Sequence, residues 1–323
     1  MKGINFRALE RIVNNFKGKK LLVVGDLLLD QFIWGEVSRI SPEAPVPVVW
    51  VKNEGFMPGG ACNVANNLAK LGADVSIVGI VGDDENGRIL KGLMHERKVD
   101  TRGVVTDESR PTILKTRVIA HHQQVVRIDR EDPKDFSGND MERIKEYLKK
   151  NIKDFDGVII EDYGKGVVTA ELLKVVVPLA RRHGKIVSVD PKENHFSYYK
   201  GASVITPNHH EASKAVGFPL TDEASMVKAG EKLINKLKLD AVLLTLGERG
   251  MMVVQKNHKP KSIPTVAQEV FDVSGAGDTV IAVYTLAMVS GGSPIVSAHI
   301  ANCAAGIVVG KIGTATVEKD ELI

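Results

Sequence analysis

The sequence has few of the features that mark membrane, secreted or nucleic-acid-binding proteins. Of its 323 residues only two are cysteines, Cys62 and Cys303, which fit neither a disulfide framework nor a zinc motif. No apolar run approaches the roughly 18 residues that span a bilayer, and the N-terminus lacks a signal-peptide core. The net charge of +3 is weak for this length, and no basic block occurs. We therefore expect a cytoplasmic protein with no membrane or nucleic-acid partner.

Several common cofactor and metal motifs are missing as well. The chain has no Walker A sequence, no Gly-x-Gly-x-x-Gly after its first apolar run and no His-Glu-x-x-His. Their absence weighs against P-loop, dinucleotide-dependent and zinc-hydrolase chemistry. The composition is otherwise ordinary for a globular protein, with 43% hydrophobic and 26% charged residues, and we expect residues 1–323 to form one domain.

Short apolar runs and helical patterns alternate along the chain. The apolar runs are 21–24, 75–80, 157–160, 186–189, 203–206 and 241–245. The helical patterns are 5–17, 60–71, 85–97, 141–151, 169–183, 222–237, 278–289 and 294–309. This alternation predicts an α/β fold with a mostly parallel sheet and helices on both faces. Ligands bind such sheets at the carboxyl ends of the strands, so we expect the functional site there.

Two segments depart from this alternation. Residues 33–52 are rich in β-forming residues but carry three prolines between positions 42 and 47, and residues 112–129 form two more β-rich stretches around His121 and His122. Proline in a sheet is confined largely to edge strands. We interpret the two segments as a small sheet that lies over the ligand site as a lid. Because exposed sheet edges can pair with another chain, we also expect a homodimer formed through the lid.

The stretch 272–279 carries the clearest chemical pattern. Gly275 and Gly277 flank Ala276, and the apolar run that follows predicts a helix beginning near Asp278. A glycine-rich turn at a helix start presents free N–H groups and the positive end of the helix dipole to an anion. In one interpretation Asp278 accepts a proton from a hydroxyl while these amides hold charge on a phosphoryl group. In the other, Asp278 only caps the helix.

Two further groups of polar residues lie near expected strand ends. Gly59 and Gly60 open a helix that carries Asn63, so a ligand could approach the backbone and bind the Asn63 amide through a hydroxyl. Asp26 and Asp30 follow the first strand, and their carboxylates suit the recognition of sugar hydroxyls. The alternatives are a glycine turn before an ordinary helix, and carboxylates that cap a local turn.

Two polar connections follow later strands. Asn208 and Glu211 have the spacing of a helix capping box, and their oxygens also suit Mg²⁺ and its waters. The two roles can coexist. Thr245, Gly247 and Gly250 lie in a connection that fits either backbone contact with a phosphate or a hairpin turn.

These pieces, in this order, resemble the ribokinase (PfkB) family of carbohydrate kinases over nearly the whole chain. The signatures are the region from Gly59 to Asn63 and the closing motif 272–278. The resemblance implies a ribokinase-like fold and phosphoryl transfer from ATP to a sugar hydroxyl, with Asp278 as base and the amides of 275–277 as anion hole. It also assigns Asn208 and Glu211 to Mg²⁺ through water, Thr245, Gly247 and Gly250 to the nucleotide, Asn302 to the adenine pocket, and Asp272 to a monovalent cation such as K⁺.

Residues 38–49 resemble more narrowly the lid of bacterial heptose 7-phosphate kinases. This implies D-glycero-β-D-manno-heptose 7-phosphate as the substrate, phosphorylated at O1 on the way to ADP-heptose, with lid residues closing over the sugar. The phosphate already on that sugar needs a cation, for which Lys192 and Arg127 are the candidates, with Arg117 behind them. Bifunctional members continue into a nucleotidyltransferase domain. Because this sequence ends at Ile323, we expect that second activity on another protein.

Two other functions stay open at this point. A kinase of another sugar, such as fructose, ribose or a nucleoside, would use the same strand ends. A sugar- or nucleotide-binding regulator could keep the fold without the chemistry. The presence of Asp278, Asn208 and Glu211 together favours an enzyme.

Overall fold

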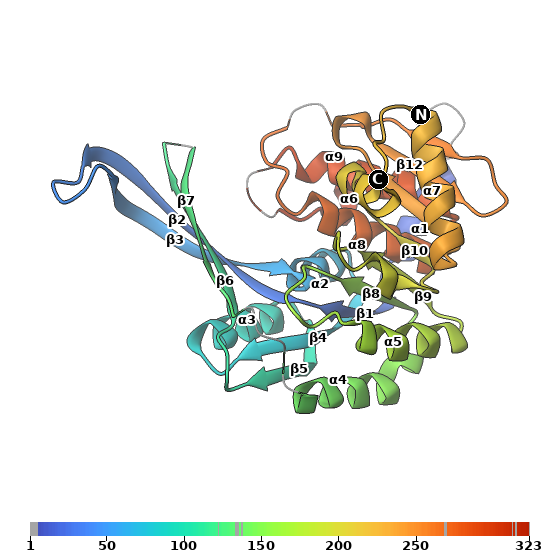
Figure 1. The fold of residues 1–323 in the computed structure, drawn as a ribbon, viewed down its shortest axis with the longest axis horizontal. Coiled ribbons are helices and arrows are strands. Elements are labelled where there is room, and N and C mark those ends of the chain that lie inside the picture. Colours follow the sequence, from blue (N-terminus) through green and yellow to red (C-terminus); the bar gives the residue numbers. More distant parts are fainter. Residues whose placement is uncertain are drawn as a thin grey trace.

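The structure is a computed structural model that describes residues 6–121, 123–132, 136, 138–267, 270–311, 313 and 315–322. His122 of the predicted lid and residue 5 of the first predicted helix lie outside these ranges. Figure 1 shows a body in which helices cover both faces of a sheet, and a long ribbon of strands that reaches out from the body. No helix in the described part of the chain is long and apolar enough to cross a membrane.

A nine-stranded sheet forms the centre of the body, in the order β13-β12-β11-β10-β9-β8-β1-β4-β5. Neighbours from β11 to β5 pair in parallel, whereas β12 and β13 join one edge antiparallel. The strands are β1 (Lys20–Gly25), β4 (Asp74–Gly82), β5 (Asp100–Asp107), β8 (Gly157–Glu161), β9 (Ile186–Asp190), β10 (Val204–Ile205), β11 (Ala241–Thr245), β12 (Met251–Gln255) and β13 (Lys261–Ile263). The mostly parallel sheet predicted from the apolar runs is confirmed.

Each face of this sheet has its own apolar core. In β1, Leu21 and Val23 enter one core and Leu22 and Val24 the other, because successive side chains of a strand point to opposite faces. The first core is covered by α1 (Phe6–Asn14), α2 (Ala61–Lys70), α3 (Glu85–Glu96), α8 (Ala276–Val289) and α9 (Pro294–Val308). The second is covered by α4 (Gly138–Asn151), α5 (Ala170–Arg182), α6 (His209–Val216) and α7 (Glu223–Leu237). Helices α2 and α8 pack together, which brings the two glycine-rich signatures to one place.

The predicted lid is a separate four-stranded sheet in the order β3-β2-β6-β7. Its strands are β2 (Leu27–Ile40), β3 (Pro47–Gly60), β6 (Ile113–Ala120) and β7 (Gln123–Arg130). Strands β2 and β3 form one antiparallel hairpin, β6 and β7 form another, and β2 pairs with β6 in parallel. Pro47 and Pro58 both lie in the edge strand β3, where a missing N–H breaks no ladder within the sheet.

The hairpin of β2 and β3 is much longer than the segment 33–52 suggested. Strand β2 has 14 residues, which corresponds to about 45 Å of extended chain. At the base of the hairpin, next to the body, Leu27 pairs with Gly60. The tip of the hairpin, in dark blue, projects away from the body in Figure 1. Residues 38–49 surround this tip, roughly 25 Å along the strand from Asp30. Within one chain, these residues therefore do not close over the site, contrary to the expectation for the lid.

Candidate active site

Asp278 lies in the first turn of α8. Gly275 precedes the helix with φ of 76°, a left-handed conformation that favours glycine, and no side chain caps this helix. The helix therefore begins at Ala276, slightly earlier than predicted. Asp278 is not its capping residue, so the structural alternative for this carboxylate is wrong.

Two donors hold the Asp278 carboxylate. Asn63 donates from Nδ2 to Oδ2 at 2.7 Å, and the Tyr163 hydroxyl donates to Oδ1 at 2.9 Å. Asp278 is only 4% exposed, and this burial raises its pKa above the usual carboxyl range, although the bonds from Asn63 and Tyr163 oppose the shift. A raised pKa makes a carboxylate a stronger base, and the two bonds fix its direction. This is the arrangement that a proton acceptor needs.

Two more acids stand beside Asp278. Glu161 ends β8 and Asp190 ends β9, and one oxygen of each lies within 4.8 Å of the others and of an Asp278 oxygen. Glu161 is fully buried, and neither of its carboxylate oxygens has a hydrogen-bond partner in the described structure. Burial, reinforced by the charges of Asp190 and Asp278, raises the pKa of Glu161 well above its usual value. Burial, with the charge of Glu211, also raises the pKa of Asp190 to about 8.

Such an acid cluster can share protons or hold a divalent cation. Oxygen ligands of this kind are those that Mg²⁺ prefers, and a buried carboxylate without partners is costly unless something binds it. The residues present therefore fit a divalent cation close to Asp278. Neither Glu161 nor Asp190 was among the predicted site residues, although both lie at strand ends, where ligands were expected.

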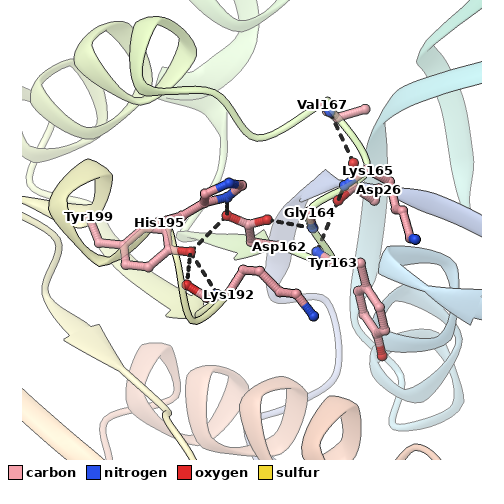
Figure 2. Close-up of polar contacts among 9 residues, drawn as sticks. All are labelled: Asp26, Asp162, Tyr163, Gly164, Lys165, Val167, Lys192, His195 and Tyr199. Atoms are coloured by element: carbon pink, nitrogen blue, oxygen red, sulfur yellow. Dashed lines mark hydrogen bonds and ion pairs between the residues drawn. The ribbon is translucent and has the colours of Figure 1, made fainter. Parts of the chain in front are cut away.

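The loop after β8 is held by Asp26 (Figure 2). The Asp26 carboxylate accepts backbone N–H groups from Tyr163, Lys165 and Val167 at 2.9 to 3.0 Å, and the residue has no exposed surface. Burial raises the pKa of Asp26 to about 6 despite these three bonds. Asp26 was predicted to bind sugar hydroxyls, but its oxygens serve the protein's own backbone. Its observed role is to place Tyr163, which in turn holds Asp278.

A second network in Figure 2 fixes the loop after β9. Asp162 accepts a hydrogen bond from the Tyr199 hydroxyl at 2.7 Å and lies 2.8 Å from Nδ1 of His195. The Tyr199 hydroxyl also accepts the backbone N–H of Lys192 at 2.7 Å. Lys192 itself is exposed, its stem lies beside Gly164, and its charge opposes the rise in the pKa of Glu211.

The glycines before α2 allow a close approach between strands. A Cβ on Gly59 would lie 2.5 Å from Oδ2 of Asp30, and Gly60 has φ of 54°. Asp30 is 5% exposed, and the Arg117 guanidinium donates to its Oδ1 at 2.6 Å. The negative charge of Asp30 also acts to raise the pKa of Asp278, so Asp30 lies near the carboxylate cluster. The structure thus brings Asp30, Gly59 and Asn63 to one side of Asp278.

Asn208 and Glu211 form the capping box at the start of α6. Asn208 Oδ1 accepts the backbone N–H groups of His210 and Glu211, and Glu211 Oε2 accepts the backbone N–H of Asn208 at 2.8 Å. The capping interpretation is confirmed. The capping box leaves out Nδ2 of Asn208 and Oε1 of Glu211. Burial raises the pKa of Glu211, and the charge of Glu211 in turn acts to raise the pKa of Asp190.

The connection between β11 and β12 lies beside Asn208. Thr245 forms a parallel β-bridge with Asn208, and Gly247 and Gly250 both have positive φ, at 60° and 82°. Because β11 and β12 pair antiparallel, the hairpin turn is confirmed. A side chain on Gly250 would also collide with the backbone of Ile263, so packing alone explains this glycine.

The other predicted site residues are more dispersed. Asn302 is buried in α9 and donates to the backbone oxygen of Pro264 at 2.8 Å. The Asp272 carboxylate accepts the N–H groups of Ser274 and Gly313 and so fastens its loop. Arg127 is exposed on the lid and pairs with Asp129 at 2.9 Å, so its charge is already engaged.

Known proteins share both this sequence and this fold. Residues 19–321 match the pfkB family of carbohydrate kinases. The chain belongs to this family. Membership places it among phosphotransferases that act on sugar hydroxyl groups.

Two curated relatives are more specific. The chain is 46% identical over 310 residues to the bifunctional protein HldE of Desulfatibacillum aliphaticivorans, covering 96% of this chain and 63% of that protein. It is 46% identical over 302 residues to HldE of Geobacter sulfurreducens, covering 94% and 62%. The chain therefore spans less than two thirds of the length of these relatives.

Solved structures support the fold. Phosphofructokinase-2 from Escherichia coli, in complex with substrates and products, has a TM-score of 0.77 at 20% identity, covering 94% of this chain and 97% of that one. Arabidopsis thaliana ribokinase, complexed with ribose and ATP, has a TM-score of 0.73 at 22% identity, covering 94% and 97%. The ribokinase-like fold predicted from the sequence is confirmed.

Proposed function

We propose that the protein transfers the γ-phosphoryl group of ATP to O1 of D-glycero-β-D-manno-heptose 7-phosphate. The observation that carries the proposal is Asp278, buried at the glycine-rich start of α8 and oriented by Asn63 and Tyr163. The substrate class is supported by the 46% identity to bifunctional HldE proteins. The acceptor panel below tests the heptose as the substrate.

In the proposed mechanism Asp278 accepts the proton of the sugar hydroxyl as its oxygen attacks the γ-phosphorus. The bond from phosphorus to the bridging oxygen of ADP breaks in line, so ADP leaves with the electron pair. The N–H groups of Gly275, Ala276 and Gly277 lie at the positive end of α8 and would hold the charge that develops on the transferred group. Asn63 and Tyr163 hold the base in place during the transfer, and Asp30 lies where it can bind a sugar hydroxyl.

ATP would lie on the side of α6, along Thr245, Gly247 and Gly250, with Asn302 beneath the adenine. Glu161 and Asp190, with Asn208 and Glu211 through water, would hold Mg²⁺, which would neutralise phosphate charge there. Lys192, close to Glu211, would face the transferred phosphoryl group. We also propose Asp272 as a ligand for a monovalent cation such as K⁺.

An ADP-release assay with Mg²⁺ and ATP tests the proposal. The panel contains the heptose 7-phosphate, fructose, ribose, a nucleoside and a buffer control. We expect release with the heptose 7-phosphate at a kcat/KM at least tenfold above any other acceptor. Faster release with another sugar would assign a different substrate, and no release across the panel would indicate a binding protein without catalytic activity.

We also propose that the lid mediates a homodimer. Several large apolar side chains of the lid are exposed, among them Ile40 at 61%, Trp50 at 66% and Ile128 at 56%. An apolar sheet surface with free edges is a common place for a second copy to pack. The long hairpin tip, with residues 38–49, would then lie against the partner. Light scattering at micromolar concentration should give twice the chain mass of 35.1 kDa, and a monomer would contradict this arrangement.

A further inference from the structure

One face of the lid sheet carries a row of charged side chains. Asp30 in β2, Lys115 in β6 and Asp129 in β7 occupy the same register position in neighbouring strands. Arg117 and Arg127 lie two residues along their strands from Lys115 and Asp129, and therefore on the same face. Because Asp30 lies beside Gly59 at the base of the lid, this face borders the site.

Most of these charges are paired within the protein. Arg117 contacts Asp30 at 2.6 Å, and Arg127 contacts Asp129 at 2.9 Å. Lys165, from the loop after β8, contacts Glu131 at 2.7 Å. These ion pairs engage Asp30, Asp129 and Glu131. Lys115 is left without an ion-pair or hydrogen-bond partner among the residues that the structure describes.

Lys115 is also close to the base. Its ammonium lies 5.5 Å from the centre of the Tyr163 ring, and the hydroxyl of the same ring donates to Asp278. Lys115 is half-buried, and burial together with the Lys165 charge lowers its pKa, which Asp30 and Asp129 only partly offset. A partly desolvated cation that forms no direct ion pair is stabilised when an anion binds it.

We propose that Lys115 binds the phosphate that the sugar substrate already carries, with Arg117 as its neighbour on the same face. The inference rests on the proposed function, because it concerns the distal end of the same substrate. A seven-carbon sugar carries O1 and its 7-phosphate at opposite ends, and the Tyr163 ring spans the interval between Asp278 and Lys115. The sugar would then lie along this ring, with O1 at Asp278 and the phosphate at the lid.

The two cations favoured from the sequence fit this role less well. Lys192 is exposed, and its charge acts on Glu211 at the start of α6, where we place the nucleotide. Arg127 is half exposed and already pairs with Asp129. Lys115 was not predicted, because its place beside Tyr163 and the pairing of Asp30 with Arg117 join segments that are far apart in the sequence.

The test compares Lys115→Gln with the unchanged protein, using the heptose 7-phosphate and the same heptose without its phosphate. Loss of a charge-assisted contact should raise KM for the phosphosugar by about 10- to 100-fold, with kcat within about threefold and KM for ATP unchanged. For the phosphate-free heptose, kcat/KM should stay within about threefold. Lys115→Arg, which keeps the charge, should retain most of the affinity for the phosphosugar. Lys145→Gln makes the same change in α4, where the partly buried Lys145 pairs with Glu142 at 2.8 Å, and should leave both substrates unaffected.

The outcomes separate this inference from the proposed function. If the unchanged protein does not phosphorylate the heptose 7-phosphate, the proposed function fails. If it does, but Lys115→Gln leaves KM unchanged, or lowers kcat/KM equally for both sugars, then Lys115 does not bind the phosphate. If the phosphate-free sugar is too poor a substrate to measure, the kinetic constants of Lys115→Gln with the phosphosugar decide. A change mainly in KM supports the inference, and a change mainly in kcat overturns it. Should Lys115→Gln fail to fold, Lys115→Met, which keeps the apolar stem, takes its place.

Discussion

Replacing Asp278 by asparagine removes the proposed base while changing the shape of the site very little. In the native chain both Asp278 oxygens accept hydrogen bonds, from Asn63 and Tyr163. Asparagine keeps one acceptor and places an amide donor where the other oxygen was. The Tyr163 hydroxyl can rotate to accept from that amide, so we expect a loss of stability of only about 1 kcal/mol.

The effect on turnover should be far larger. General-base catalysis contributes about 10²- to 10⁴-fold, which corresponds to roughly 3 to 5.5 kcal/mol of activation free energy. Burial raises the pKa of Asp278 and so increases its strength as a base, and asparagine cannot accept the proton at all. We therefore expect kcat to fall at least about 100-fold, while the affinity for ATP changes by less than about threefold.

Single-turnover ADP release and equilibrium binding of a fluorescent ATP analogue measure the two quantities separately. Thermal unfolding provides the control for stability. Turnover within about tenfold of the unchanged protein would refute the role of Asp278 as base. An equal loss of ATP affinity would show that Asp278 acts on the nucleotide instead.

Two further variants test the groups around the base. Tyr163→Phe removes a hydrogen bond that lowers the pKa of Asp278. The acidic limb of the pH profile of kcat should therefore move to higher pH, and kcat at the plateau should be about tenfold lower. An acidic limb at the same pH would contradict the role of this hydrogen bond. Asp26 titrates in the folded state at about 6 instead of 3.8, so its contribution to stability is present below pH 3.8 and is lost as the pH rises through 6. Relative to Asp26→Asn, the unchanged protein should lose roughly 2.5 kcal/mol of unfolding free energy between pH 4 and pH 7, measured by urea denaturation, and parallel curves would refute the raised pKa.

The sequence predicts the body of the fold because its signals there are local. Apolar runs such as 21–24 and 157–160 are short and continuous, as buried parallel strands require, and the capping box of Asn208 and Glu211 lies within four residues. Strand β5 was missed because its burial alternates and its residues are mostly polar or small. The hairpin of β2 and β3 was cut short because its base passes without a break into the body.

The site was predictable only in part, because its contacts join distant segments. A carboxylate after a strand has the same local pattern whether it pairs with a side chain of a distant strand, as Asp30 does with Arg117, or accepts backbone N–H groups, as Asp26 does. Tyr163 reaches Asp278 across 115 positions of sequence. Glu161 acquires its unusual burial from strands on both sides. These residues become recognisable only when the fold brings them together.

The identity of the phosphorylated product tests the central claim most directly. The protein is incubated with ATP, Mg²⁺ and D-glycero-β-D-manno-heptose 7-phosphate, and the sugar is examined by phosphorus NMR. The account predicts a second phosphate resonance coupled to the anomeric proton, formed in a one-to-one ratio with ADP. A phosphate on another carbon, or ADP formed without a second sugar phosphate, would contradict it.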